Sequence, residues 1–224
     1  MFKKVLITIT CRNPNEILIE NLEDLYNNLI NNGFFNWKFY LNYYKDLRDC
    51  GFKTEKDALN HWKKYGKKAG RISNNYKYKI VCVDSDSNNM DTYKIIEKSF
   101  PKVEILYAKN KNYEYGAYKY AFNKYPNYDI YVCLQDTFLI KKNLKLNLID
   151  DYTCYFYHAN HSGFFSDKNT KKFGEKVLKS SNLKYEDIID TNFKFSEYNS
   201  FIVSNNVLKD IFKTLIIPPT NKNE

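Results

Sequence analysis

The chain opens with an unbroken run of apolar and β-branched residues from Val5 to Thr10. Such a run is typical of a strand buried on both faces of a parallel sheet. A helix is expected next, because Asn13-Pro14-Asn15-Glu16 offers a capping side chain, a proline for the first helical position and a glutamate three residues after the cap. Leucines then recur at helical spacing until Gly33: Leu18, Leu22, Leu25 and Leu29. The pattern predicts a strand, a loop and a helix.

Strand and helix signals alternate again after residue 74. Strands are expected over 79–83, 103–107 and 130–134, and helices over 90–100 and 115–124. Beyond residue 140 the pattern changes, with strands expected over 154–158 and 200–203 and helices over 170–180, 185–190 and 207–212. Alternation of this kind requires right-handed crossovers and a largely parallel sheet, with ligands at the carboxyl ends of the strands. The predicted fold class is therefore α/β and Rossmann-like, with helices flanking a mostly parallel central sheet.

Residues 34–73 interrupt this alternation. The segment is rich in aromatic residues and is divided by Gly51, with a capping signal at Thr54 before a second helical stretch that ends at Gly66. It predicts a two-helix hairpin inserted into a domain made of residues 1–33 and 74–224. Trp37 and Trp62 are expected in a small core of the hairpin rather than in a ligand-binding platform. The hairpin would also offer a surface for oligomer formation.

The net charge is +9, from 35 basic and 26 acidic residues. The lysines are spread along the chain among Asn, Tyr and Ile, as expected from an AT-rich coding sequence, so a nucleic-acid partner is not the favoured interpretation. The pairs Lys63-Lys64 and Lys67-Lys68 are interpreted as a solvated helix face.

Five cysteines without a CxxC pair suggest neither a disulfide framework nor a zinc site. A reducing, intracellular compartment is expected, the host cytoplasm or virion if the source is a virus. No apolar run approaches the ~20 residues of a membrane span, and the first run is too short for a signal peptide.

Polar residues that could carry chemistry follow the predicted strands. Asp84 comes after the second strand, Asn110 and Asn112 after the third, and Asp136 after the fourth, while Gly116-Ala117 lie where a helix opens. Because the carboxyl ends of parallel strands share one edge of a sheet, these residues are expected to converge there.

This order resembles the nucleotide-binding half of GT-A glycosyltransferases, especially inverting family-2-like members, over residues 3–140 and 198–212. The resemblance implies that Asp84 accepts hydrogen bonds from the nucleotide base and that Asp136 holds Mn²⁺ or Mg²⁺ on the diphosphate of a UDP- or GDP-sugar. It further implies a nucleotide pocket shaped by these residues: Thr10, Arg12, Asn110, Gly116, Ala117 and Gln135. Residues 34–73 resemble a small module that accompanies many bacterial and viral glycosyltransferases, with matching letters Asp46, Leu47, Gly51, His61, Trp62, Gly66, Gly70 and Arg71.

The acidic motif departs from the family pattern, since Gln135-Asp136-Thr137 offers one carboxylate where two or three are usual. One carboxylate suffices if diphosphate and water complete the shell; otherwise the site is metal-independent or inactive. Either Asp84 or Asp136 taken alone is also compatible with a helix cap. His158 and His161 are interpreted as an ordinary polar loop.

An inverting transferase needs a carboxylate base beside the acceptor hydroxyl. In the family this residue follows the late strand, which makes Glu224 the candidate here, with Asp167, Glu186 and Glu197 as weaker ones. Three functions remain open from the sequence. The leading one is sugar transfer to a glycan or glycoprotein acceptor. The others are a catalytically silent GT-A-like binding module and nucleic-acid binding through the basic surface.

Overall fold

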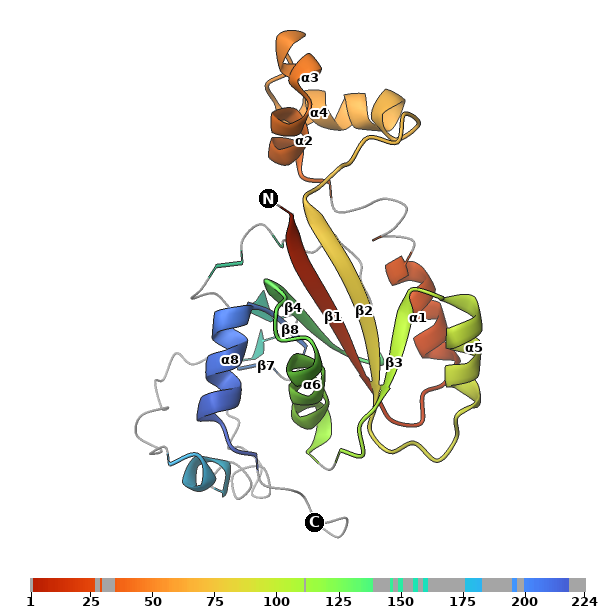
Figure 1. Cartoon of the computed structure of the whole chain (residues 1–224), viewed down its shortest axis with the longest axis vertical. Coiled ribbons are helices and arrows are strands. Elements are labelled where there is room, and N and C mark those ends of the chain that lie inside the picture. Colours follow the sequence, from red (N-terminus) through yellow and green to blue (C-terminus); the bar gives the residue numbers. More distant parts are fainter. Residues whose placement is uncertain are drawn as a thin grey trace.

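The computed structural model describes residues 2–26, 29, 35–110, 112–138, 146, 149–150, 155–156, 159–160, 176–182, 195–196 and 200–217. Its centre is a six-stranded sheet with the strand order β3-β2-β1-β4-β8-β5 (Figure 1). The strands are β1 (Lys3–Cys11), β2 (Tyr76–Asp84), β3 (Val103–Tyr107), β4 (Ile130–Gln135), β5 (Tyr155–Phe156) and β8 (Phe201–Ser204). The first four are parallel, and β8 is antiparallel to both β4 and β5. A separate pair, β6 (Ala159–Asn160) and β7 (Phe195–Ser196), is antiparallel.

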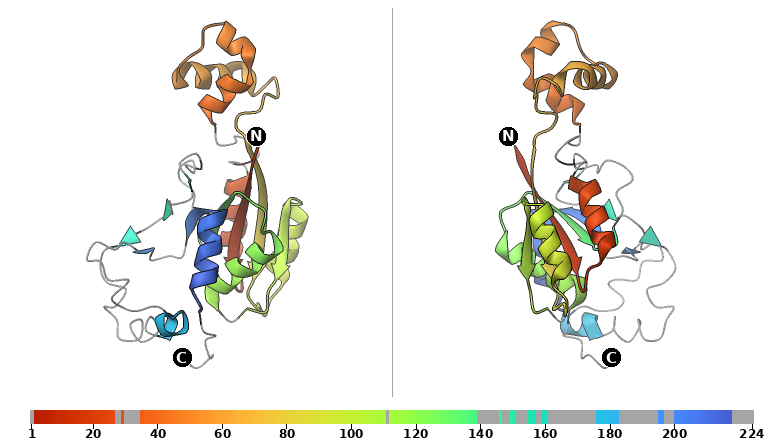
Figure 2. Two further views of the ribbon diagram at one scale, coloured as in Figure 1. Left: turned by 60° about the vertical axis from the view of Figure 1, so that its left-hand side comes forward. Right: turned by 90° about the vertical axis from the view of Figure 1, so that its right-hand side faces the viewer.

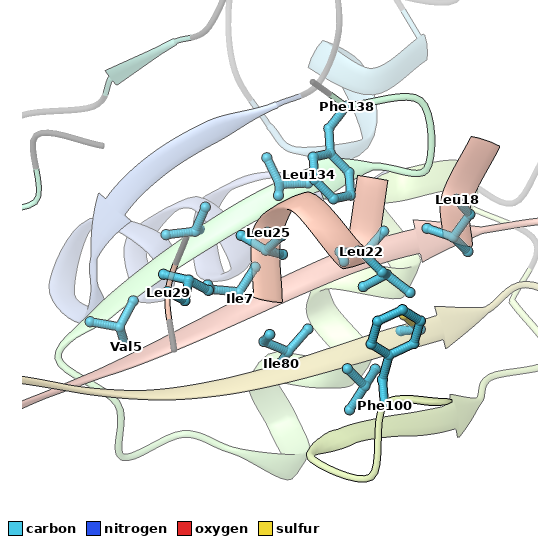
Figure 3. Close-up of a cluster of buried hydrophobic side chains, with 14 of the residues drawn as sticks. Val5, Ile7, Leu18, Leu22, Leu25, Leu29, Ile80, Phe100, Leu134 and Phe138 are labelled. Carbon is cyan, nitrogen blue, oxygen red and sulfur yellow. The ribbon is translucent and has the colours of Figure 1, made fainter. Parts of the chain in front are cut away.

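Helices cover both faces of the sheet (Figure 2). The helices are α1 (Glu16–Tyr26), α5 (Asp91–Ser99), α6 (Tyr113–Lys124) and α8 (Asn205–Thr214). Successive side chains of a strand point to opposite faces. Accordingly, Val5 and Ile7 of β1 join a core cluster with α1 and α5, shown in Figure 3, whereas Leu6 joins a second cluster with α6 and α8. The α/β class and the mostly parallel sheet predicted from the sequence are confirmed.

The start of α1 differs from the prediction. The helix begins at Glu16, and Asn15 Oδ1 accepts a hydrogen bond from the Ile17 N–H at 3.1 Å. Asn13 has a left-handed φ of 50° and bonds to the loop after β2 instead. The predicted cap at Asn13 was wrong, because a tertiary contact uses this side chain and Asn15 supplies the local one.

Residues 35–73 contain more helices than the predicted hairpin. They form α2 (Trp37–Tyr43), α3 (Lys45–Asp49), α4 (Glu55–His61) and a π-helical turn (Trp62–Gly66). The aromatic stretch is two helices rather than one, because Tyr44 is extended (φ −101°, ψ 99°). Thr54 and Asp57 form a reciprocal capping box at the start of α4, as the sequence indicated. None of these residues, all of them described, joins the sheet.

A small core of its own holds this helical module (residues 35–73) together. Its buried members are Tyr40, Leu41, Leu47 and Ala58, with Phe35, Trp37 and Trp62 packed around them. Gly66 is required where it stands, because an added Cβ would collide with the Tyr40 hydroxyl. Arg71 donates to both carboxylate oxygens of Asp46, at 3.2 and 2.7 Å. The motif letters Asp46, Trp62, Gly66 and Arg71 therefore stabilise the module internally.

The module projects from the amino ends of β1 and β2 (Figure 1). Its two ends lie side by side, since the Asn36 N–H donates to the Ser73 carbonyl at 2.9 Å. No helix of the described residues is long and apolar enough to cross a membrane.

Candidate functional site

Parallel pairing brings the carboxyl ends of neighbouring strands to one edge of the sheet. Cys11 of β1 is opposite Asp84 of β2, and Thr10 of β1 is opposite Gln135 of β4. The chain runs from β1 through β2 to β3 on one side and then crosses to β4 on the other. The boundary between β1 and β4 is thus the switch point of the sheet, where open α/β folds bind their ligands.

Asp84 is nearly buried, with 5% of its surface exposed. Its carboxylate already has two internal donors: the Ser87 N–H, at 3.2 Å from both oxygens, and the Tyr93 hydroxyl, at 2.8 Å from Oδ1. Burial raises the pKa of Tyr93, which therefore stays a hydroxyl donor. Asp84 closes the turn after β2 and fastens it to α5. The sequence left this structural role open. A nucleotide base that bound Asp84 would have to share the carboxylate with these two internal donors.

Asn13 ties the first two loops of this edge together. Its N–H donates to Ser87 Oγ at 2.7 Å, and its Oδ1 accepts from the Asn88 N–H at 2.8 Å. The loop after β1 and the loop after β2 are therefore held as one surface. The signal for this contact in the sequence was the asparagine at position 13, because asparagine tolerates a left-handed backbone conformation.

The structure brings Asn110 and Gly116 together. Asn110 Nδ2 donates to Ser85 Oγ at 3.2 Å, and Asn110 Oδ1 accepts from the Asn112 N–H at 2.8 Å. The same Oδ1 lies against Gly116 so closely that a Cβ there would overlap it. Ala117 is fully buried in the second core cluster, so its role is to pack α6 on the sheet. Asn110 and Gly116, which were predicted to shape the same pocket, are therefore in contact although they are six positions apart in the sequence.

Gln135 and Glu114 form a polar pair at the switch point. Gln135 Nε2 donates to Glu114 Oε1 at 2.8 Å, which fixes one carboxylate oxygen of α6 beside the end of β4. The Gln135 N–H in turn lies 3.3 Å from Ser200 Oγ, on the far side of β4. Sequence reasoning missed Glu114. Its only signal was an acidic side chain in the first turn of the helix that follows the Asn110 loop.

Burial raises the pKa of Asp136 above its ordinary value, and the negative charge of Glu114 adds to the rise. Hydrogen bonds from the Arg12, Asp136 and Thr137 N–H groups act in the opposite direction. The Arg12 side chain itself is exposed. Asp136 therefore links the end of β1 to the end of β4 across the switch point, and it does so as a partly desolvated carboxylate.

Thr10 is nearly buried, with 7% of its surface exposed. Its hydroxyl lies beside that of Tyr118 on α6, whose pKa is raised by burial. Of the nucleotide contacts predicted from the sequence, Thr10 and Ala117 thus face the interior.

The side chains at the switch point that could ligate a metal offer mainly oxygen atoms. They are the carboxylates of Asp136 and Glu114 and the amide of Gln135. This set suits hard cations such as Mg²⁺ or Mn²⁺ rather than zinc. Within the described residues, no three His, Cys, Asp or Glu side chains are grouped as a metal site. A cation held here would need further oxygens from its ligand.

Several predicted residues lie outside the described part of the chain. They are the candidate base Glu224, the weaker candidates Asp167, Glu186 and Glu197, and the histidines His158 and His161. A scan against protein-family models found no match, and a search of curated proteins found none either.

Proposed function

We propose that this chain is a nucleotide-sugar-dependent glycosyltransferase of the GT-A type, which transfers a sugar from a UDP- or GDP-sugar to a glycan or glycoprotein acceptor. The observation that carries the proposal is the polar group at the β1–β4 switch point. A partly desolvated Asp136 lies there with the Glu114–Gln135 pair and exposed Arg12. A desolvated carboxylate at a ligand-binding edge is the kind of group that active sites use.

Asp136 and Glu114 would hold a Mn²⁺ or Mg²⁺ ion together with the diphosphate of the donor. When bound, the cation would offset the charge that gathers on the leaving diphosphate. The chain's own contribution is to hold the groups of the site in position. Gln135 fixes the Glu114 carboxylate by its 2.8 Å hydrogen bond, and the loops after β1 and β2 are held in place by Asn13.

Calorimetric titration of UDP and GDP with and without Mn²⁺ tests the proposal. In the native chain each ligand should raise the affinity of the other by the same factor, about tenfold or more. Asp136→Asn should abolish this coupling and leave metal-free nucleotide binding nearly unchanged. Glu97→Gln, which removes an exposed charge on α5, is the matched control. Equal nucleotide affinities in all conditions would mean that Asp136 is only a structural residue.

A catalytically silent binding module is the second candidate, and one observation favours it. The Asp84 carboxylate is engaged by Ser87 and Tyr93, so the group meant for the nucleotide base already serves the fold. A donor-hydrolysis assay separates the two functions. A silent module would bind nucleotide, with or without metal, and release no sugar from any donor in a panel of nucleotide sugars.

A further inference from the structure

The positive charge of this protein is concentrated in the helical module. Residues 35–73 hold ten basic and four acidic side chains, a net charge of +6 out of +9 for the whole chain. Four of the lysines stand within six residues at the end of the π-helical turn and the turn after it: Lys63, Lys64, Lys67 and Lys68, all exposed. These are the two lysine pairs that the sequence already singled out, and the module's excess charge also reflects its small number of acidic residues.

Two of the module's four acidic side chains are engaged away from this cluster. The Asp46 carboxylate is bound to Arg71, and Asp57 is used in the capping box of α4. Among the described residues, Lys63, Lys64 and Lys68 take part in no ion pair. In the lysine cluster (residues 63, 64, 67 and 68), Lys63, Lys64 and Lys68 therefore present their charge to the surroundings, and Lys67 is exposed beside them.

The candidate site cannot be the reason for this charge. The module stands at the amino ends of β1 and β2, whereas Asp84 and Gln135 are at the carboxyl ends (Figure 1). A strand of nine residues, such as β1, spans roughly 25–30 Å at ~3.3 Å per residue. A phosphate bound at the carboxyl edge is then beyond the reach of these lysines, so their charge does not serve the candidate site.

We propose that the lysine cluster docks the protein on an anionic membrane surface. This interaction is separate from nucleotide binding and would hold whether or not the chain is a transferase. Clusters of four or more basic residues on a helix are attracted to anionic lipid headgroups, at a range set by salt screening. The module projects as a lobe at one end of the molecule, so a flat surface can approach it without meeting the sheet (Figure 2).

Two observations favour a lipid surface over a nucleic-acid strand. The first is the use of arginine, the side chain best suited to bidentate phosphate or base recognition. Both arginines of the module are engaged internally, Arg71 with Asp46 and Arg48 with the carbonyls of Leu41 and Asn42. What remains are ammonium groups on flexible stems, which suit diffuse attraction to a charged surface.

The second observation concerns Tyr65, which lies within the lysine cluster and is 53% exposed. Stacking of bases requires an open aromatic face. Here Lys64 Nζ lies over the ring at 5.1 Å, and the His61 ring is 5.6 Å away between centroids. The ring is thus a poor platform for bases. A half-exposed tyrosine flanked by lysines suits the headgroup level of a membrane, where tyrosine is enriched.

Vesicle sedimentation of the full chain tests this proposal. The native protein should bind vesicles of phosphatidylcholine mixed with phosphatidylserine, and should not bind vesicles of phosphatidylcholine alone. Binding should be lost when the salt is raised to about 1 M, where screening acts within ~3 Å. Changing the four clustered lysines to glutamine should weaken binding about 100-fold or more, because each contributes independently near the surface.

The matched control removes the same charge elsewhere, by changing Lys98, Lys102, Lys209 and Lys213 to glutamine; all four are exposed and lie outside the module. It should keep most of the vesicle binding. Thermal melting of both variants checks that each is folded. Equal loss in the two variants, or binding that does not need phosphatidylserine, overturns the proposal. The proposal is also overturned if a single-stranded oligonucleotide displaces the protein from vesicles and binds it more tightly through the same lysines.

Discussion

Three carboxylates of this protein carry different roles because their surroundings differ. Asp84 is buried beside neutral donors, Asp136 is desolvated and faces another acid, and Glu104 on β3 lies among cations. Asp84 and Asp136 are both aspartates at the carboxyl end of a strand, Asp84 as the last residue of β2 and Asp136 directly after β4. Only the neighbours separate a side chain that fastens a turn from one that remains suited to binding a ligand.

The double role of Asp84 can be separated by a pair of variants. Asp84→Ala removes both the turn contact and the proposed base contact, so it should lower the free energy of unfolding by about 1–3 kcal/mol and weaken nucleotide binding. Tyr93→Phe removes only the internal donor at 2.8 Å, so it should cost stability but not affinity. Chemical denaturation and calorimetry measure the two effects. If Asp84→Ala leaves the affinity for UDP and GDP unchanged, Asp84 is no part of a nucleotide site.

Glu104 predicts a pH dependence of stability. Burial acts to raise its pKa, but hydrogen bonds from Lys124, Lys79 and Tyr125 outweigh burial and lower the pKa from 4.5 to about 2. A lowered folded-state pKa adds stability above pH 4.5 that is lost as the pH falls toward 2. Because the pairs are partly exposed, Glu104→Gln should cost only ~1–2 kcal/mol at pH 7.

The cost of Glu104→Gln should shrink steadily between pH 4.5 and 2 in urea unfolding at a series of pH values. Glu97→Gln, which removes one exposed negative charge on α5, is the matched control. A cost that is the same at pH 3 and pH 7 would show that Glu104 contributes through packing and not through its charge.

At the scale of elements, the start of α6 is where fold and candidate site meet. Asn110 fastens the loop to Ser85 and fills the space that Gly116 leaves, while Glu114 lies in the same first turn and reaches Gln135. The other face of α6 packs on the sheet through Ala117. A small residue at 116 is therefore needed for the loop and helix to approach, and the position of Glu114 depends on it.

Gly116→Ala tests this dependence. Alanine is intrinsically the better helix residue by about 1 kcal/mol, yet the added Cβ would overlap Asn110 Oδ1. We expect a net loss of about 1–3 kcal/mol in unfolding free energy. The loss should be largely rescued in the double variant Gly116→Ala/Asn110→Gly, relative to Asn110→Gly alone. Additive effects of the two changes would mean that the contact does not limit the packing of α6.

At the scale of the whole molecule, two units meet at one narrow connection. The sheet with its four helices has two core clusters, whereas the module has its own around Tyr40 and Leu47. The backbone enters and leaves the module at Asn36 and Ser73, which are joined by a 2.9 Å hydrogen bond. The candidate site lies at the end of the sheet away from this connection (Figure 1).

Replacing residues 36–73 by a short glycine-containing turn should therefore leave the remaining chain folded. The ends to be joined are already adjacent, and a short loop costs little closure entropy. We expect a cooperative thermal transition and unchanged UDP or GDP affinity in the shortened protein. Loss of cooperative unfolding would show that the module is an integral part of the core and not an insertion.

The sequence by itself determined the α/β class and the positions of the main strands and helices. Local periodicity suffices for this, because a strand such as Val5 to Thr10, buried on both faces, must be apolar throughout. It also placed Asp84, Gln135 and Asp136 at the carboxyl edge, since each comes where a predicted strand ends, whereas Glu114, on a helix, carried no such signal. The break at Tyr44 was missed because a single extended residue leaves no mark on an aromatic-rich helical pattern.

Only the tertiary structure decided what those polar residues contact. Asn13 leaves its local cap to join Ser87, Asp84 is taken by Tyr93, and Glu114 reaches Gln135 across 21 positions of sequence. These pairings depend on how loops from separate strands pack together, which no local pattern records. The distribution of charge is a further example. The sequence determines the net charge of +9, whereas the fold places the charge of the module at the end of the molecule away from the candidate site.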